Sequence, residues 1–204
     1  MYKTICAGLL VILCMGLLSG CSKKADVETS TVFIEKKGNI VSVDVEALDR
    51  DYYDMDELES YITEHVTEYT DKNGETIEKE SFVVADGKAK LMMKYDTCED
   101  YTGFNGIELY NGTVVKARAA GYDFDTEFYS PEDDTQKVGK DTVIAEDDNN
   151  VAIIRANVDV QVPGTILYVS VQEGTNTAVT GKNKVSITSG ESGEEAGLTY
   201  IVYK

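Results

Sequence analysis

Tryptophan is absent from this chain, and histidine occurs once, as His65. The lack of tryptophan weakens any interpretation as a sugar-stacking protein. A Ser-His-Asp or Cys-His arrangement would need His65, and nothing in the sequence places a nucleophile near it. On a helical wheel His65 lies in an apolar stripe beside Leu58 and Ile62, so we expect a buried or boundary histidine. One histidine with few cysteines also disfavours zinc. We therefore predict no catalytic, cofactor-binding or metal-binding residues.

Basic residues are scarce: 19 Lys and Arg stand against 37 Asp and Glu, for a net charge of −18. Such a surface repels nucleic acid, so we expect no nucleic-acid partner. The acids form local runs at 49–51, 132–134 and 146–148. Charge runs of this kind usually mark solvated loops, and we favour that interpretation over binding of divalent cations or cationic polymers.

The N-terminus has the layout of an export signal. Lys3 precedes an apolar run, Ile5–Leu18, which is shorter than the roughly 20 residues that span a bilayer. The stretch Leu18-Ser19-Gly20-Cys21 resembles the lipobox of bacterial lipoproteins. That resemblance implies cleavage before Cys21 and attachment of acyl chains such as palmitate to its thiol. We expect a signal peptide over 1–20, a lipid-anchored tether over 21–30 and one domain over 31–204, on the extracytoplasmic face of the cell membrane.

The cysteines leave no disulfide in such a mature chain. Cys6 and Cys14 are removed with the signal, and Cys21 carries the lipid, so only Cys98 remains. The acids Glu99 and Asp100 beside Cys98 disfavour a thiolate. We expect an inert, partly buried thiol.

Periodicity predicts a mixed fold. Alternating residues over 31–47 and 81–95 indicate two β-hairpins, the second turning at Asp86-Gly87. Residues 54–72 read as a helix that Asp54 caps and Asn73-Gly74 ends. Its apolar positions form one stripe: Met55, Leu58, Ile62, Val66 and Tyr69.

Two short helices are expected near 97–101 and 114–120, a long surface loop over 130–150, and strands over 151–162, 165–171, 184–188 and 198–203. The order lacks regular βαβ alternation. We therefore predict an α+β fold, a mainly antiparallel sheet with one long amphipathic helix and two short helices.

A calcium loop is a weaker alternative near the end of the long helix. Asp71, Asn73, Gly74 and Glu80 match four positions of an EF-hand loop, but Tyr69 stands where the first aspartate is required. Termination of the helix explains the same residues, and we favour it.

Tyrosine is plentiful, with 13 in the chain. Those in connectors beside acids, Tyr52, Tyr53, Tyr122 and Tyr129, are our candidates for an exposed binding surface that suits peptide or glycan. Ordinary packing is the alternative for each of them.

Several phrases resemble a recurring core in uncharacterised lipoproteins of anaerobic Firmicutes. They are Gly103-Phe104-Asn105-Gly106, Tyr110–Val114, Ala119–Phe124, Val162–Ser170 and Tyr200–Lys204. The resemblance implies a secreted, membrane-tethered domain, and it implies no functional residue.

These patterns favour a lipid-anchored extracytoplasmic binding or interaction protein, with the membrane as a partner through Cys21 and a peptide, glycan or protein as its ligand. One alternative is a hydrolase of envelope or extracellular polymer that uses acidic residues. Another is an accessory subunit of a surface complex. A carboxylate pair in a deep cleft would favour the enzyme, whereas a shallow tyrosine-lined face or an open sheet edge would favour binding.

Overall fold

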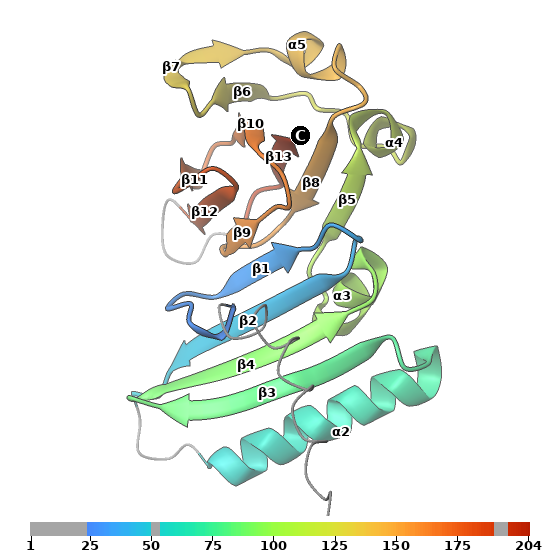
Figure 1. Ribbon diagram of the computed structural model, residues 1–204, viewed down its shortest axis with the longest axis vertical. Coiled ribbons are helices and arrows are strands. Elements are labelled where there is room, and N and C mark those ends of the chain that lie inside the picture. The colour runs from blue at the N-terminus through green and yellow to red at the C-terminus, as the bar shows by residue number, and fades with distance from the viewer. Residues whose placement is uncertain (1–23, 50–53, 190–195) are drawn as a thin grey trace, which may run out of the picture.

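Two β-sheets form the framework of the described chain (Figure 1). The computed structural model describes residues 24–49, 54–189 and 196–204. In spatial order, the seven-stranded sheet consists of β11 (Thr175–Val179), β12 (Lys184–Ser189), β9 (Asp159–Gln161), β1 (Thr31–Ile34), β2 (Ile40–Ala47), β4 (Lys88–Tyr95) and β3 (Ile77–Ala85). The six-stranded sheet consists of β5 (Leu109–Thr113), β8 (Asn150–Ile154), β13 (Thr199–Tyr203), β10 (Ile166–Val171), β6 (Glu127–Ser130) and β7 (Asp133–Val138).

Both predicted hairpins are present. β1 pairs with β2, and β3 pairs with β4, in antiparallel registers. The second hairpin turns at Asp86 and Gly87, which have φ angles of 53° and 73°. Positive φ at both central residues matches the right-handed twist of the flanking strands, which is why Asp-Gly is favoured there. Among the described pairings only β1 with β9 is parallel.

Helix α2 (Met55–Asn73) begins and ends where local signals predict. The Asp54 carboxylate accepts hydrogen bonds from the backbone N–H groups of Asp56 and Glu57, both at 3.0 Å. At the other end, the Gly74 N–H donates to the Thr70 carbonyl. The predicted N-cap at Asp54 and the predicted end of the helix at Asn73-Gly74 are therefore confirmed.

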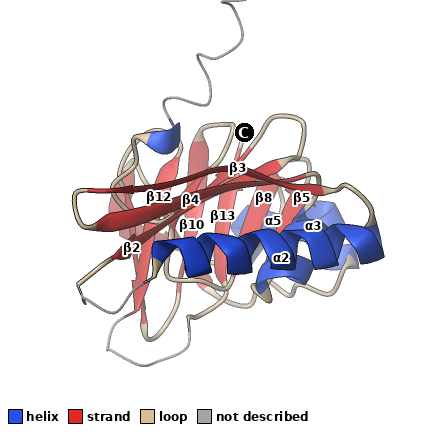
Figure 2. Ribbon diagram, turned by 90° about the horizontal axis from the view of Figure 1, so that it is seen from below, coloured by secondary structure: helices blue, strands red, loops and turns tan. Residues whose placement is uncertain are grey.

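The predicted fold class is wrong, because the helix does not build the core. α2 buries none of its residues, so it is not the long amphipathic helix that the α+β prediction required. It lies along one face of the seven-stranded sheet beside β3, the outermost strand (Figure 2). The described chain is mostly β, and a second sheet covers the core where the prediction placed a helix.

The other helices are short: α3 (Cys98–Asn105), α4 (Val114–Ala119) and α5 (Lys140–Ile144). α5 and β7 lie inside the stretch 130–150 that we expected to be a loop, and Val143 of α5 is fully buried. The sequence does not predict these two elements, because the segment is acidic and its few apolar residues show neither helical nor strand periodicity.

The largest core joins the two sheets. It includes Val32 and Val160 from the seven-stranded sheet and Ile154 and Ile201 from the six-stranded sheet, and Tyr101 of α3 also belongs to it. Each sheet also has apolar residues on its outer face. In the six-stranded sheet, Val151, Ile153, Tyr200 and Val202 pack against α4, α5 and the aromatic residues Phe124 and Phe128.

On the seven-stranded sheet, the outer cluster consists of Phe33, Val41, Val43 and Met92, with Val27 packed against it. Only part of this outer face is covered by described residues, because Val83 of β3 remains 52% exposed.

Candidate functional site

Tyr122 lies in a tight loop that follows α4. The Tyr122 N–H donates to the Ala117 carbonyl at 3.1 Å, and Gly121 before it has a φ of 103°. Phe124 also has a positive φ, 56°, which is costly for a residue with a side chain. Its ring is fully buried, and that packing holds the strained backbone in place. The loop therefore holds the backbone of Tyr122 in a defined position.

Tyr122 lines a shallow depression of about 480 Å³ on the outer side of the six-stranded sheet. Residues from four separate parts of the chain meet there. The lining consists of Glu108, Ala120, Gly121, Tyr122, Asp123, Gln172, Leu198 and Tyr200.

Polar contacts position the carboxylate of the depression. The Tyr122 hydroxyl donates to Glu108 Oε1 at 3.2 Å, and Arg155 Nε donates to Glu108 Oε2 at 3.2 Å. The Arg155 N–H also donates to the Glu108 carbonyl at 3.1 Å. These contacts fix the Glu108 side chain at one wall of the depression, with Oε1 bonded to Tyr122 and Oε2 bonded to Arg155.

Both phenols of the depression stay protonated at neutral pH. Burial, and then the negative charge of Glu108, raises the pKa of Tyr122 to about 12. Burial and the charge of Asp123 raise the pKa of Tyr200 as well. The Tyr122 hydroxyl therefore remains a hydrogen-bond donor to the Glu108 carboxylate, and the Tyr200 hydroxyl keeps its proton as well.

The tyrosine rings belong to a continuous aromatic cluster. Ring centroids of Tyr110 and Tyr122 are 5.1 Å apart, those of Tyr122 and Tyr200 are 6.3 Å apart, and those of Tyr200 and Phe124 are 4.9 Å apart. Tilted and edge-to-face rings at these distances attract one another. The depression thus combines one partly exposed aromatic ring, that of Tyr122, with carboxylate, amide and hydroxyl groups, which suits a ligand rich in hydrogen-bonding groups with a small apolar face.

The other predicted tyrosines lie elsewhere. Tyr129 packs against the core between the sheets, and its hydroxyl donates to the Thr177 carbonyl at 3.2 Å. Tyr122 packs on the opposite face of the six-stranded sheet, so the two residues do not share a surface. Tyr52, Tyr53 and the lipidation residue Cys21 lie outside the described residues.

His65 is exposed, and the expectation of a buried or boundary histidine is wrong. Its ring lies 3.9 Å from that of Tyr61, itself 57% exposed, and its Nδ1 is 3.0 Å from the Tyr61 carbonyl. The cause is the position of α2 along the outermost strand, which leaves most of the helix surface in solvent.

Cys98 and the weak calcium pattern both have structural roles. Burial, and then the charge of Glu99, raises the pKa of the Cys98 thiol to about 12, as expected for an inert cysteine. Asn73 and Gly74 end α2, whereas Glu80 lies in β3 and pairs with Lys94 at 3.8 Å. Within the described ranges, no group of three or more His, Cys, Asp or Glu side chains is arranged to hold a metal ion.

Sequence reasoning missed Glu108, Gln172 and Tyr200 as neighbours of Tyr122. They lie far apart along the chain, and only the pairing of β5, β8, β13 and β10 brings them together. No local pattern marks them. For the part of the chain that the structure describes, no helix is long and apolar enough to cross a membrane.

Comparisons with family models, with curated proteins and with solved structures found no match to this chain.

Proposed function

We propose that this chain is a lipid-anchored extracytoplasmic binding protein whose ligand site is the depression around Tyr122. The anchor is proposed from Leu18-Ser19-Gly20-Cys21. The observation that carries the binding role is the convergence of Tyr122, Tyr200 and Glu108 in one shallow, rigidly supported hollow.

The chemistry of the hollow supports binding of a peptide or glycan fragment. The Tyr122 ring offers area for an apolar ligand face at little entropic cost, because the loop and the neighbouring rings already hold it. Glu108, Asp123 and Gln172 offer acceptors for hydroxyl, amine or amide donors on the ligand.

Replacing Tyr122 by Ala should weaken ligand binding about tenfold, equivalent to about 1.4 kcal/mol, because the aromatic wall is lost. The measurement is an NMR titration of the mature chain produced without lipid. The probes are a muropeptide, a chitin oligosaccharide and a short peptide, which separate the glycan and peptide alternatives. Tyr61→Ala, which removes an exposed ring on α2, is the matched control. Equal affinity of the Tyr122 and Tyr61 variants, or chemical-shift changes confined to other surfaces, would contradict the site.

Replacing Cys21 by Ser should abolish acylation and release the protein from the membrane fraction, because the thiol is the acceptor that the lipobox pattern predicts. Metabolic labelling with an alkyne fatty acid, followed by fractionation of the cells, measures both effects. Cys98→Ser is the control, since its thiol is buried. Label retained on the Cys21 variant would show that this residue is not the lipidated one.

A further inference from the structure

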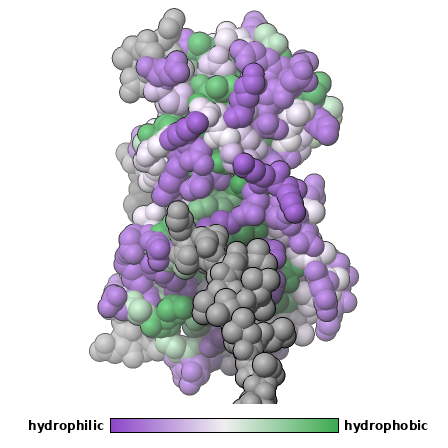
Figure 3. Space-filling model, viewed as in Figure 1, coloured by the Kyte–Doolittle hydropathy of each residue, from purple (hydrophilic) through white to green (hydrophobic). Residues whose placement is uncertain are grey.

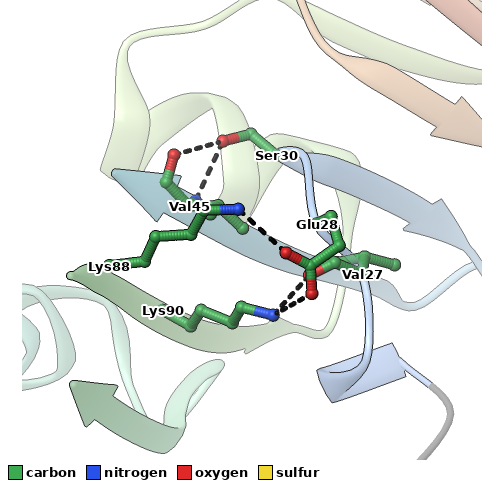
Figure 4. Close-up of polar contacts among 6 residues, drawn as sticks. All are labelled: Val27, Glu28, Ser30, Val45, Lys88 and Lys90. Atoms are coloured by element: carbon green, nitrogen blue, oxygen red, sulfur yellow. Dashed lines mark hydrogen bonds and ion pairs between the residues drawn. The ribbon is translucent and has the colours of Figure 1, made fainter. Parts of the chain in front are cut away.

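The described chain begins on the outer face of the seven-stranded sheet, where a short N-terminal segment, residues 24–30, is fastened to the strands (Figure 4). Glu28 lies between two lysines of β4: its Oε2 is 2.8 Å from Lys88 Nζ, and its Oε1 is 3.1 Å from Lys90 Nζ. Lys90 Nζ also donates to the Val27 carbonyl at 2.7 Å. The hydrogen bonds from both lysines lower the pKa of the Glu28 carboxyl, so it stays ionised.

Further contacts fix both ends of this segment. Ser30 Oγ accepts from the Val45 N–H at 2.9 Å and donates to the Val45 carbonyl at 3.3 Å (Figure 4). Thr29 donates to Asp159 Oδ2 at 2.8 Å. Lys24 pairs with Glu35 and lies 5.5 Å from the ring centroid of Phe33. Residues 24–30, which the sequence suggested as part of a tether, are therefore packed against the domain.

An apolar groove of about 340 Å³ borders this segment. Its apolar lining comes from Ala25, Val43, Val83, Ala85 and Met92. Figure 3 shows hydrophobic residues at the β3–β4 hairpin on this face.

Lysines lie along the same face. Lys88, Lys90 and Lys94 alternate along β4 on the side of the strand that carries Met92. They offset the glutamates Glu28, Glu78 and Glu80 with which they pair. In a chain of net charge −18, this local compensation of charge lowers the electrostatic cost of approaching anionic headgroups. The aliphatic part of a lysine side chain can also lie along an apolar boundary while its ammonium group reaches water.

We infer that this outer face rests on the membrane to which the chain is anchored, with Val83 and the groove at the boundary between headgroups and acyl chains. The inference rests on the proposed lipid at Cys21. Three residue steps separate Cys21 from Lys24, and an extended chain covers about 10 Å in that distance. Because residues 24–30 are fastened to the sheet, the lipid can reach the bilayer only with this face close to it. α4, which precedes the Tyr122 loop, lies toward the other end of the molecule's long axis from β3 and β4, away from the groove (Figure 1).

Depth-dependent fluorescence quenching tests this orientation. Lipidated protein carrying Val83→Cys is labelled with an environment-sensitive dye and reconstituted into vesicles of phosphatidylethanolamine and phosphatidylglycerol that contain doxyl-labelled lipid. Cys98 is buried and its thiol has a raised pKa, so labelling is selective for position 83. Val115→Cys, at a residue of α4 that is 45% exposed, is the matched control.

We expect the label at position 83 to lose most of its emission and the label at position 115 to keep it. Glu28→Gln, which weakens both lysine contacts, should reduce the quenching at position 83. If the protein stays with the vesicles and positions 83 and 115 are quenched equally, or position 83 is not quenched, the inference is overturned while the anchor stands. If the protein does not associate with vesicles, the proposed anchor fails and the inference fails with it. If the emission of the dye at position 83 changes only when envelope proteins are added, the face binds a protein partner, and the membrane contact is overturned.

Discussion

Replacing Ile201 by Asp should abolish cooperative folding of the domain. Ile201 lies in β13 with no exposed surface, opposite Val169 of β10 and Ala152 of β8, in the core between the sheets. A carboxylate there has no cationic partner in the surrounding apolar cluster. An unpaired buried charge costs several kcal/mol, comparable with the 5–15 kcal/mol that holds a typical domain together.

The matched control is Ile62→Asp, the same change on α2. Ile62 is only half-buried, so we expect a loss of about 1 kcal/mol. Urea unfolding followed by circular dichroism compares the two variants. Midpoints that moved equally would mean that α2 contributes as much to the core as the second sheet does, contrary to the burial of its residues.

Raising the pH from about 9 to 12 should unfold the protein through its buried tyrosines. Burial raises the pKa of Tyr95 and of Tyr203 to about 12, from an ordinary value of 10.0. Because the folded-state pKa is the higher one, the stabilisation is complete below pH 10 and is lost as the pH rises through 12. A shift of this size corresponds to about 3 kcal/mol for each residue. Thermal midpoints measured across this pH range should fall steeply.

Two substitutions separate the tyrosine effect from general repulsion between carboxylates. Tyr203→Phe removes a hydroxyl that donates to Asn111 Oδ1 at 2.7 Å, so it should lower stability at pH 8 and flatten the fall above pH 10. Tyr61→Phe, at an exposed residue, should leave the pH dependence unchanged. Absorbance at 295 nm follows tyrosinate formation directly. Ionisation of all tyrosines near pH 10 before unfolding would contradict the prediction.

The elements that local chemistry decides were predictable. Asp86-Gly87 favours a tight hairpin because both residues tolerate positive φ, and Asp54 caps α2 because its carboxylate reaches free N–H groups within the next turn. Each of these depends on neighbours a few residues away. The apolar stripe of α2 is equally visible in the sequence, yet it predicts more burial than α2 has. Periodicity shows which side of a helix is apolar, but it cannot show how much of that side a sheet will cover.

The sequence by itself determined the hairpins, the ends of the long helix and the acidic surface, and it carries the pattern behind the proposed lipid at Cys21. Only the tertiary structure decided that two sheets form the core, that Tyr122 meets Glu108 and Tyr200, and that residues 24–30 are fastened to β4. The physical reason is the range of the interactions. Capping and turn formation act within one turn of chain, whereas strand order and the neighbours of a surface tyrosine follow from pairings between distant segments, whose free energy depends on the whole packed core.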